Sequence, residues 1–133
     1  MSFPIEKTDE EWKAQLGLER FKILRQKGTE FSHSGKYNLF NQNGVYCCGG
    51  CGEPLFKSDS KFDAHCGWPS FDKAIKGAVT YVKDTSLGMT RTEVNCAKCG
   101  GHLGHVFDDG PRETTGQRFC TNSVSIEFKP AKK

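Results

Sequence analysis

Six of the seven cysteines in this chain of 133 residues fall into two groups with different chemistry. Four of them form two Cys-x-x-Cys pairs, Cys48 with Cys51 and Cys96 with Cys99, and a glycine follows each pair. Two such pairs are typical of a closed tetrahedral zinc site, which ties strands together and contributes folding energy. We therefore predict one structural Zn²⁺ per chain, bound by these four thiolates.

Two other ligand arrangements fit the same residues. Cys96 and Cys99 could bind a metal ion with His102 and His105, but four ligands within ten residues would have difficulty surrounding one ion. The two Cys-x-x-Cys pairs could instead be redox dithiols. We favour the four-cysteine site because it gives every paired cysteine a role and releases both histidines. Cys47 is expected to be a small buried residue.

Cys120 lies where a reactive thiol is expected. Strand alternation over the run 117–129 places Arg118, Cys120 and Asn122 on one face. The same face continues into three apolar residues, Val124, Ile126 and Phe128. This pattern predicts that the face packs on the core, with the thiol at its rim between a guanidinium and an amide. A fixed positive charge nearby should lower the pKa of the thiol and favour the thiolate.

Two histidines, His102 and His105, lie in a Gly-rich run just before this strand. Imidazoles titrate near neutral pH and can deliver protons to a bound ligand, so the pair is expected to act together with Cys120. Asp109 could orient an imidazole, pair with Arg118 or cap a turn.

A second spare thiol, Cys66, opens the run 66–71, which also contains a rigid proline turn, Trp68 and Phe71. Aromatic residues alone more often belong to the core. Beside a free thiol they suggest a resolving cysteine next to a receptor for a small apolar group.

Composition argues against several other classes. The net charge is +3, and Lys and Arg are scattered rather than gathered in the stripe that nucleic-acid binding requires. No apolar run approaches the roughly 20 residues of a membrane helix, and the sequence after Met1 lacks the basic start and apolar stretch of a secretory signal. We predict a cytoplasmic chain with neither a nucleic-acid nor a membrane partner.

Residues 1–28 carry helical signals. Thr8 and Glu11 form a capping box for a helix that runs to Gly17. A second helical pattern runs from Leu18 to Lys27 and stops at Gly28, a natural left-handed cap.

Residues 45–129 form short β-rich runs separated by Gly, Pro and Asp. The predicted strands are Val45–Cys48, Pro54–Lys57, Ala78–Lys83, Thr90–Asn95, Gly104–Asp108 and Gln117–Lys129. The predicted fold is mainly β: two antiparallel sheets in a small sandwich or barrel, with short N-terminal helices and a four-cysteine zinc site. A chain of this length is expected to form a single domain over residues 1–133.

Taken in order, these motifs resemble the B-type methionine-R-sulfoxide reductases over nearly the whole chain. The landmarks are Thr29-Glu30, Gly35-Lys36-Tyr37, both Cys-x-x-Cys pairs, the runs 66–71 and 101–107, Glu93-Val94, and the run 118–123. One departure is His65, where the family frequently has Gly.

The resemblance implies a role for each candidate residue. Cys120 would be the nucleophile and Cys66 the resolving thiol. Trp68 would hold the terminal methyl of the substrate, while His102 and His105 would act on the sulfoxide oxygen. Asp109, Arg118 and Asn122 would tune the site, with Asn122 also contacting substrate.

The resemblance also implies the reaction and its partners. Methionine-R-sulfoxide, free or in proteins, would be reduced through a sulfenic acid on Cys120. The resulting disulfide with Cys66 would be reduced by thioredoxin, and the enzyme would be a monomer.

Two functions of other classes explain fewer of these residues. A zinc-ribbon binding module would use the paired cysteines but neither Cys120 nor Cys66. A Cys-His hydrolase would use Cys120 and His105 as nucleophile and base but has no need of Cys66.

Overall fold

The computed structural model describes residues 5–30, 35–38, 40–64, 66–85, 88 and 90–131. Two short helices lie near the N-terminal end of this part of the chain. Helix α1 spans Asp9–Leu16 and α2 spans Leu18–Leu24. The predicted capping box is confirmed: Thr8 Oγ1 accepts from the Glu11 amide at 3.2 Å, and the Thr8 amide donates to Glu11 Oε1 at 2.9 Å. Neither of these two described helices is long and apolar enough to cross a membrane.

The end of α2 differs from the prediction. The helix stops at Leu24, and Lys27 rather than Gly28 takes the left-handed conformation, with φ 58°. The Gly28 amide donates back to the Lys22 carbonyl at 3.0 Å, which closes the turn without a left-handed glycine. The result points the Lys27 ammonium at Glu93 in the sheet, 3.2 Å away.

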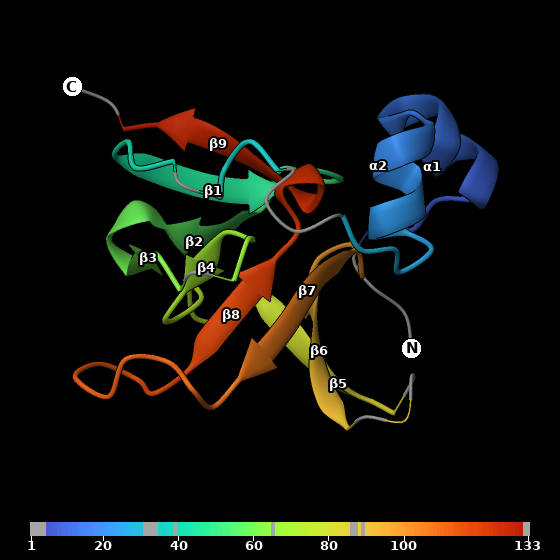
Figure 1. The fold of residues 1–133 in the computed structure, drawn as a ribbon. Coiled ribbons are helices and arrows are strands. Elements are labelled where there is room, and N and C mark those ends of the chain that lie inside the picture. The colour runs from blue at the N-terminus through green and yellow to red at the C-terminus, as the bar shows by residue number, and fades with distance from the viewer. Residues whose placement is uncertain are drawn as a thin grey trace.

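The strands form two antiparallel sheets, as predicted (Figure 1). In the described residues they are β1 (Gly44–Cys48), β2 (Pro54–Lys57), β3 (Lys61–Phe62), β4 (Ser70–Phe71), β5 (Val79–Asp84), β6 (Arg91–Cys96), β7 (His102–Phe107), β8 (Arg118–Thr121) and β9 (Ile126–Pro130). One sheet has the order β2-β1-β9 and the other the order β3-β4-β8-β7-β6-β5. Short 3₁₀ helices lie at Ser58–Ser60 (η1) and Ser123–Ser125 (η3).

The prediction of a single continuous strand over Gln117–Lys129 is wrong. It divides into β8 in the large sheet and β9 in the small one, joined by η3, where the chain crosses from sheet to sheet. The predicted facing of Cys120 is therefore also wrong. Phe119 and Thr121 are the buried residues of β8, while Arg118 and Cys120 are half-buried on the opposite face. The apolar Ile126 and Phe128, which suggested a core-facing thiol, belong to the other sheet.

The core lies between the two sheets and is rich in aromatic rings. Phe56 of β2 stacks on Phe71 of β4 with ring centroids 4.3 Å apart, and Phe119 of β8 meets Phe56 edge-on at 5.8 Å. Tyr46 of β1 contacts Phe71 at 5.0 Å. Because this core uses one face of the six-stranded sheet, the opposite face is left for the candidate site.

Strand register fixes which side chains share that opposite face. Ser70 of β4 pairs with Cys120 of β8, Cys120 with His105 of β7, and His105 with Glu93 of β6. Directly paired residues of antiparallel strands project to the same side. A row of polar and reactive side chains therefore crosses four strands.

Candidate active site

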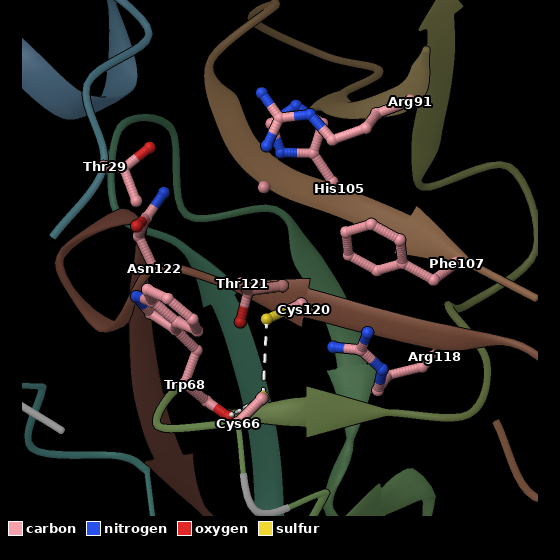
Figure 2. Close-up of a pocket in the computed structure, with 11 residues that line it drawn as sticks. Thr29, Cys66, Trp68, Arg91, His105, Phe107, Arg118, Cys120, Thr121 and Asn122 are labelled. Atoms are coloured by element: carbon pink, nitrogen blue, oxygen red, sulfur yellow. Dashed lines mark hydrogen bonds between the residues drawn. The ribbon is translucent and has the colours of Figure 1, made fainter. Parts of the chain in front are cut away.

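Cys66 and Cys120, the two cysteines predicted to be reactive, meet at this face of the six-stranded sheet. Cys120 Sγ lies 3.6 Å from Cys66 Sγ, close enough for a disulfide to form with little movement (Figure 2). The pairing of β4 with β8 places them together, because Cys66 precedes β4 by four residues and its Sγ also lies 3.3 Å from Ser70 Oγ. Both thiols are half-buried.

The thiols lie at the base of a cavity of about 250 Å³. Its lining is Thr29, Cys66, Trp68, Arg91, Gly104, His105, Phe107, Arg118, Cys120, Thr121 and Asn122. In Figure 2, Trp68, Asn122 and Thr29 form one wall, Phe107 and Arg118 the other, and His105 and Arg91 lie above Cys120. A cavity slightly smaller than the roughly 300–1,000 Å³ usual for ligand sites suits a single side chain.

Six of the predicted site residues line this cavity, and two do not. The six are Cys66, Trp68, His105, Arg118, Cys120 and Asn122. His102 is buried, 3% exposed, and Asp109 is an exposed partner of Arg118 that does not line the cavity. His65, beside Cys66 in the sequence, lies outside the described residues.

Gly104 permits β7 to approach β8 at the nucleophile candidate. A Cβ at this position would lie 2.0 Å from the carbonyl oxygen of Cys120. Any other residue would therefore push the two strands apart at the point where His105 pairs with Cys120.

Arg118 is held rigidly beside the thiols. Its Nε and Nη2 atoms donate to the two carboxylate oxygens of Asp109 at 2.8 and 3.2 Å, and its guanidinium lies 4.4 Å from the Phe107 ring centroid. The bidentate pair lowers the pKa of Asp109. Of the three roles left open for Asp109, pairing with Arg118 is the one this geometry contains.

The prediction of a lowered Cys120 pKa is wrong. Burial and the nearby Cys66 raise the pKa of Cys120 to about 12, and Arg118 opposes them only in part. Burial also opposes ionisation of Cys66, yet hydrogen bonds with Ser70 and the backbone at Trp68 outweigh it and lower its pKa. Two thiols this close lose one proton readily and the second with difficulty. Cys66 is the thiol that ionises first.

One residue, Glu30, holds both Trp68 and Asn122. Its backbone carbonyl accepts from Trp68 Nε1 at 3.0 Å, and its amide donates to Asn122 Oδ1 at 3.0 Å. The buried Glu30 carboxylate accepts from the Val124 amide at 3.1 Å, and burial raises its pKa. Sequence reasoning placed Glu30 among the family landmarks but gave it no role.

The two histidines of β7 bond carboxylates on two other strands, β5 and β6. His105 Nε2 lies 2.8 Å from Asp84 Oδ2, and His102 Nδ1 lies 2.8 Å from Glu93 Oε2. Burial lowers the pKa of His102 more than Glu93 raises it. Sequence reasoning missed Asp84, and it named Glu93 among the family landmarks without giving it a role. Glu93 gave one usable signal, since it is an acidic residue in the middle of a predicted strand, and here it is 3% exposed.

The cysteines of the two Cys-x-x-Cys pairs form a separate cluster at the C-terminal ends of β1 and β6. Their Sγ atoms all lie within 4.8 Å of one another, with Cys48 and Cys99 at 3.7 Å and Cys51 and Cys96 at 3.6 Å. A tetrahedral ion with sulfur ligands at about 2.3 Å needs sulfurs about 3.8 Å apart. The cluster can therefore hold a metal ion without rearrangement.

The pKa shifts and hydrogen bonds of these cysteines also suit metal binding. Hydrogen bonds with the other three cysteines raise the pKa of Cys48, whereas that of Cys96 is lowered, so four thiolates cannot coexist there without a cation. The Gly50 amide donates to Cys48 Sγ at 3.3 Å. Both histidines bond carboxylates instead, so the alternative set with His102 and His105 is not formed. Cys47 is buried, as predicted.

A cavity over two facing thiols, in a β fold with a four-sulfur cluster, defines a thiol-dependent oxidoreductase. Comparison with known proteins makes this specific. The SelR domain family matches residues 16–130. Proteins named "Peptide methionine sulfoxide reductase MsrB" match over nearly full length: that of Chromohalobacter salexigens is 50% identical over 131 residues, 98% of both chains, and that of Pseudomonas fluorescens is 56% identical over 127 residues, 95% of this chain and 96% of the other. The chain belongs to this family, the B-type peptide methionine sulfoxide reductases.

A solved structure of the Mis18 "Yippee-like" domain resembles the fold alone. It superposes with a TM-score of 0.52 at 16% sequence identity, covering 69% of this chain and all of that one. The likeness supports the β architecture and says nothing about chemistry.

Proposed function

We propose that this chain reduces the R epimer of methionine sulfoxide, with Cys120 as nucleophile and Cys66 as resolving thiol. Family membership makes methionine sulfoxide reduction its activity. The single observation that carries the residue assignment is the 3.6 Å contact between these two thiols at the base of a cavity.

Each step balances in atoms and electrons. The Cys120 sulfur attacks the substrate sulfur and takes over its oxygen, so that methionine leaves and Cys120 becomes a sulfenic acid. The Cys66 thiol then displaces water from that sulfenic acid and forms a disulfide. Thioredoxin, through two thiols of its own, reduces this disulfide and returns both cysteines to the starting state.

Proton supply is the demanding part of the first step. The departing oxygen must be protonated, and His105 is the titratable cavity residue that lies directly opposite Cys120 in the sheet. Because burial and Cys66 raise the pKa of Cys120, its thiol must give up a proton for the attack on the substrate sulfur. Arg118 is the fixed positive charge that favours the thiolate at that moment. The His102 ring contacts the His105 ring edge-on, with the centroids 5.5 Å apart, and so helps to hold it in place.

The walls of the cavity fit the two ends of a sulfoxide. Trp68 offers an apolar surface for the terminal methyl, and Asn122 and His105 offer polar groups for the oxygen. A sulfoxide sulfur has three different substituents and a lone pair. Fixing methyl, oxygen and the attacking Cys120 on different sides therefore selects one epimer.

We further propose that the four-cysteine cluster binds Zn²⁺. Four thiolates without an open position match a structural zinc site, which supplies folding energy and takes no part in the redox steps. Cys48, Cys51, Cys96 and Cys99 would be its ligands. The cytoplasmic location, the monomeric state and a single domain over residues 1–133 remain predictions from the sequence.

The test uses the separate R and S epimers of a blocked methionine sulfoxide, with thioredoxin, thioredoxin reductase and NADPH. We expect thioredoxin-dependent turnover of the R epimer only, abolished by Cys120→Ser. Cys66→Ser should release about one methionine per chain and then stop. Sustained thioredoxin-driven turnover by Cys66→Ser would remove Cys66 from the mechanism, and turnover of the S epimer would contradict the selectivity.

A further inference from the structure

We infer that Asp84 is a positioning residue that fixes which ring nitrogen of His105 faces the substrate. The inference rests on the proposed function, because it gives His105 the role of proton donor. Asp84 has no motif that would single it out in the sequence. It is the last residue of β5, the edge strand of the six-stranded sheet.

Asp84 reaches His105 across the intervening strand β6. Its Oδ2 lies 2.8 Å from His105 Nε2 and 3.3 Å from Nη2 of Arg91, its register partner on β6. The side chains of Asp84 and His105 are 19% and 14% exposed, so water competes weakly for this bond. Arg91 adds a positive charge that attracts the carboxylate and holds it in place.

The bond determines the tautomer of His105. An ionised carboxylate only accepts hydrogen bonds, so Nε2 of His105 must carry the hydrogen. Nδ1 is then the nitrogen left for a ligand in the cavity that His105 lines. An imidazolium in this position donates its Nδ1 proton to the sulfoxide oxygen and relaxes to the tautomer that Asp84 already stabilises.

His102 provides a contrast within the same strand. Its Nδ1, rather than its Nε2, bonds a carboxylate, that of Glu93. The two histidines therefore hold opposite tautomers, although they lie three residues apart on β7. His102 does not line the cavity. The pair is thus divided into a cavity-facing ring oriented by Asp84 and a buried ring oriented by Glu93.

The first experiment is a double-mutant cycle on the single-turnover rate of methionine release from the R sulfoxide without reductant. Asp84→Asn keeps the shape of the side chain and removes its charge. Loss of the carboxylate partner of a metal-bound histidine typically costs about 10- to 100-fold in activity, and we expect a fall of similar size here, with little change in half-saturating substrate concentration. In a His105→Gln background the same substitution should change the rate less than about twofold. Asp59→Asn, on exposed η1, is the matched control and should leave the rate unchanged.

An equal fall in both backgrounds would overturn the inference, because Asp84 would then act through something other than His105. An unchanged rate for Asp84→Asn would overturn it as well. Folding is checked by the thermal unfolding midpoint of each variant.

The second experiment measures the wild-type protein, and substitutions serve only to assign the histidine signals. Ring ¹⁵N chemical shifts of the wild-type protein report which imidazole nitrogen carries hydrogen. We expect Nε2–H for His105 and Nδ1–H for His102, and Nδ1–H at His105 would overturn the inference. A wild-type protein that releases no methionine would defeat the proposed function, whereas the tautomer result would still decide the role of Asp84.

Discussion

Glu30 and Asn122 are joined across 92 residues of sequence by a hydrogen bond from the Glu30 amide to Asn122 Oδ1, 3.0 Å long. The other end of the amide, Nδ2, donates to the Leu103 carbonyl at 3.2 Å. Asn122 lies where the chain leaves β8 for η3, so it fixes the crossing between the two sheets. A residue proposed to contact substrate is therefore also part of the scaffold.

Asn122→Ala should destabilise the fold as well as slow the reaction. It leaves the buried Glu30 amide without its partner, which costs about 1–3 kcal/mol, whereas the Leu103 carbonyl still accepts from the Asn122 backbone amide at 2.9 Å. We expect a loss of about 1–3 kcal/mol in the free energy of unfolding, measured in urea. Asn41→Ala at an exposed position should change stability by less than about 0.5 kcal/mol. Equal stabilities for the two variants would show that the Asn122 bonds do not hold the crossing.

Cys66→Ser should make Cys120 more acidic. Both effects of Cys66 on Cys120, its charge and its hydrogen bond, raise the pKa of Cys120. Their loss must lower that pKa from about 12 and increase the thiolate fraction at neutral pH. The measurement is the rate of Cys120 alkylation by iodoacetamide between pH 7 and about 10, read by peptide mass spectrometry.

In the wild type that rate should rise about tenfold per pH unit across the range, because the thiolate fraction of Cys120 grows until its pKa is reached. In Cys66→Ser the rate should be higher at pH 7 and level off earlier. Buried Cys47 is the internal control and should stay unmodified in both. A slower reaction of Cys120 in the variant would contradict the interpretation.

Much of the scaffold could be predicted, because its signals are local. The capping box of α1 and the bounds of β2 follow from residues within a few positions of one another. The four-cysteine cluster followed from two identical short motifs. Strands β3 and β4 were missed because each has two residues, too few to show alternation.

The errors arose where distant contacts override local pattern. Alternation continued formally through Ser123–Ser125, but the chain there turns from one sheet into the other, so the facing inferred for Cys120 from Ile126 was reversed. The pKa of Cys120 also depended on a residue 54 positions away, Cys66. The carboxylate partners of both histidines lie on other strands, and only the register brings them together.

Arg118→Met should make the Cys120 thiol less reactive, whereas Cys66→Ser should make it more readily alkylated. Arg118 lowers the pKa of Cys120, so its removal raises that pKa further and reduces the thiolate fraction. Alkylation of Cys120 and single-turnover methionine release should both fall. Arg112→Met, at an exposed position of the same loop region, is the control and should react as the wild type does.

Arg118→Lys separates charge from geometry. Lysine keeps the positive charge but loses the two-point contact with Asp109 and the stacking on Phe107. We expect alkylation rates between those of the wild type and Arg118→Met. Rates equal to Arg118→Met would mean that the planar fork, rather than the charge alone, favours the thiolate.

Removal of the metal should loosen the N-terminal helices. Trp12 of α1 is buried beside the cluster, where a Cβ on Gly50 would lie 3.4 Å from its ring, and Arg25 of α2 donates to the Cys99 carbonyl at 2.8 Å. In a Trp68→Phe background Trp12 is the only tryptophan. A chelator or Cys96→Ser should shift its fluorescence to longer wavelength and lower the unfolding midpoint.

One zinc per chain is expected by mass spectrometry. It should be lost in Cys96→Ser and kept when His102 and His105 are both replaced.

The central claim is that one pair of cysteines exchanges electrons while the other four hold a metal. The most direct measurement is disulfide mapping of the zinc-loaded protein after one equivalent of the R sulfoxide without reductant, with zinc content read on the same sample. We predict one methionine released per chain, a single disulfide between Cys66 and Cys120, and full retention of zinc. A disulfide within the set Cys48, Cys51, Cys96 and Cys99, with loss of zinc and both spare thiols still free, would contradict the account.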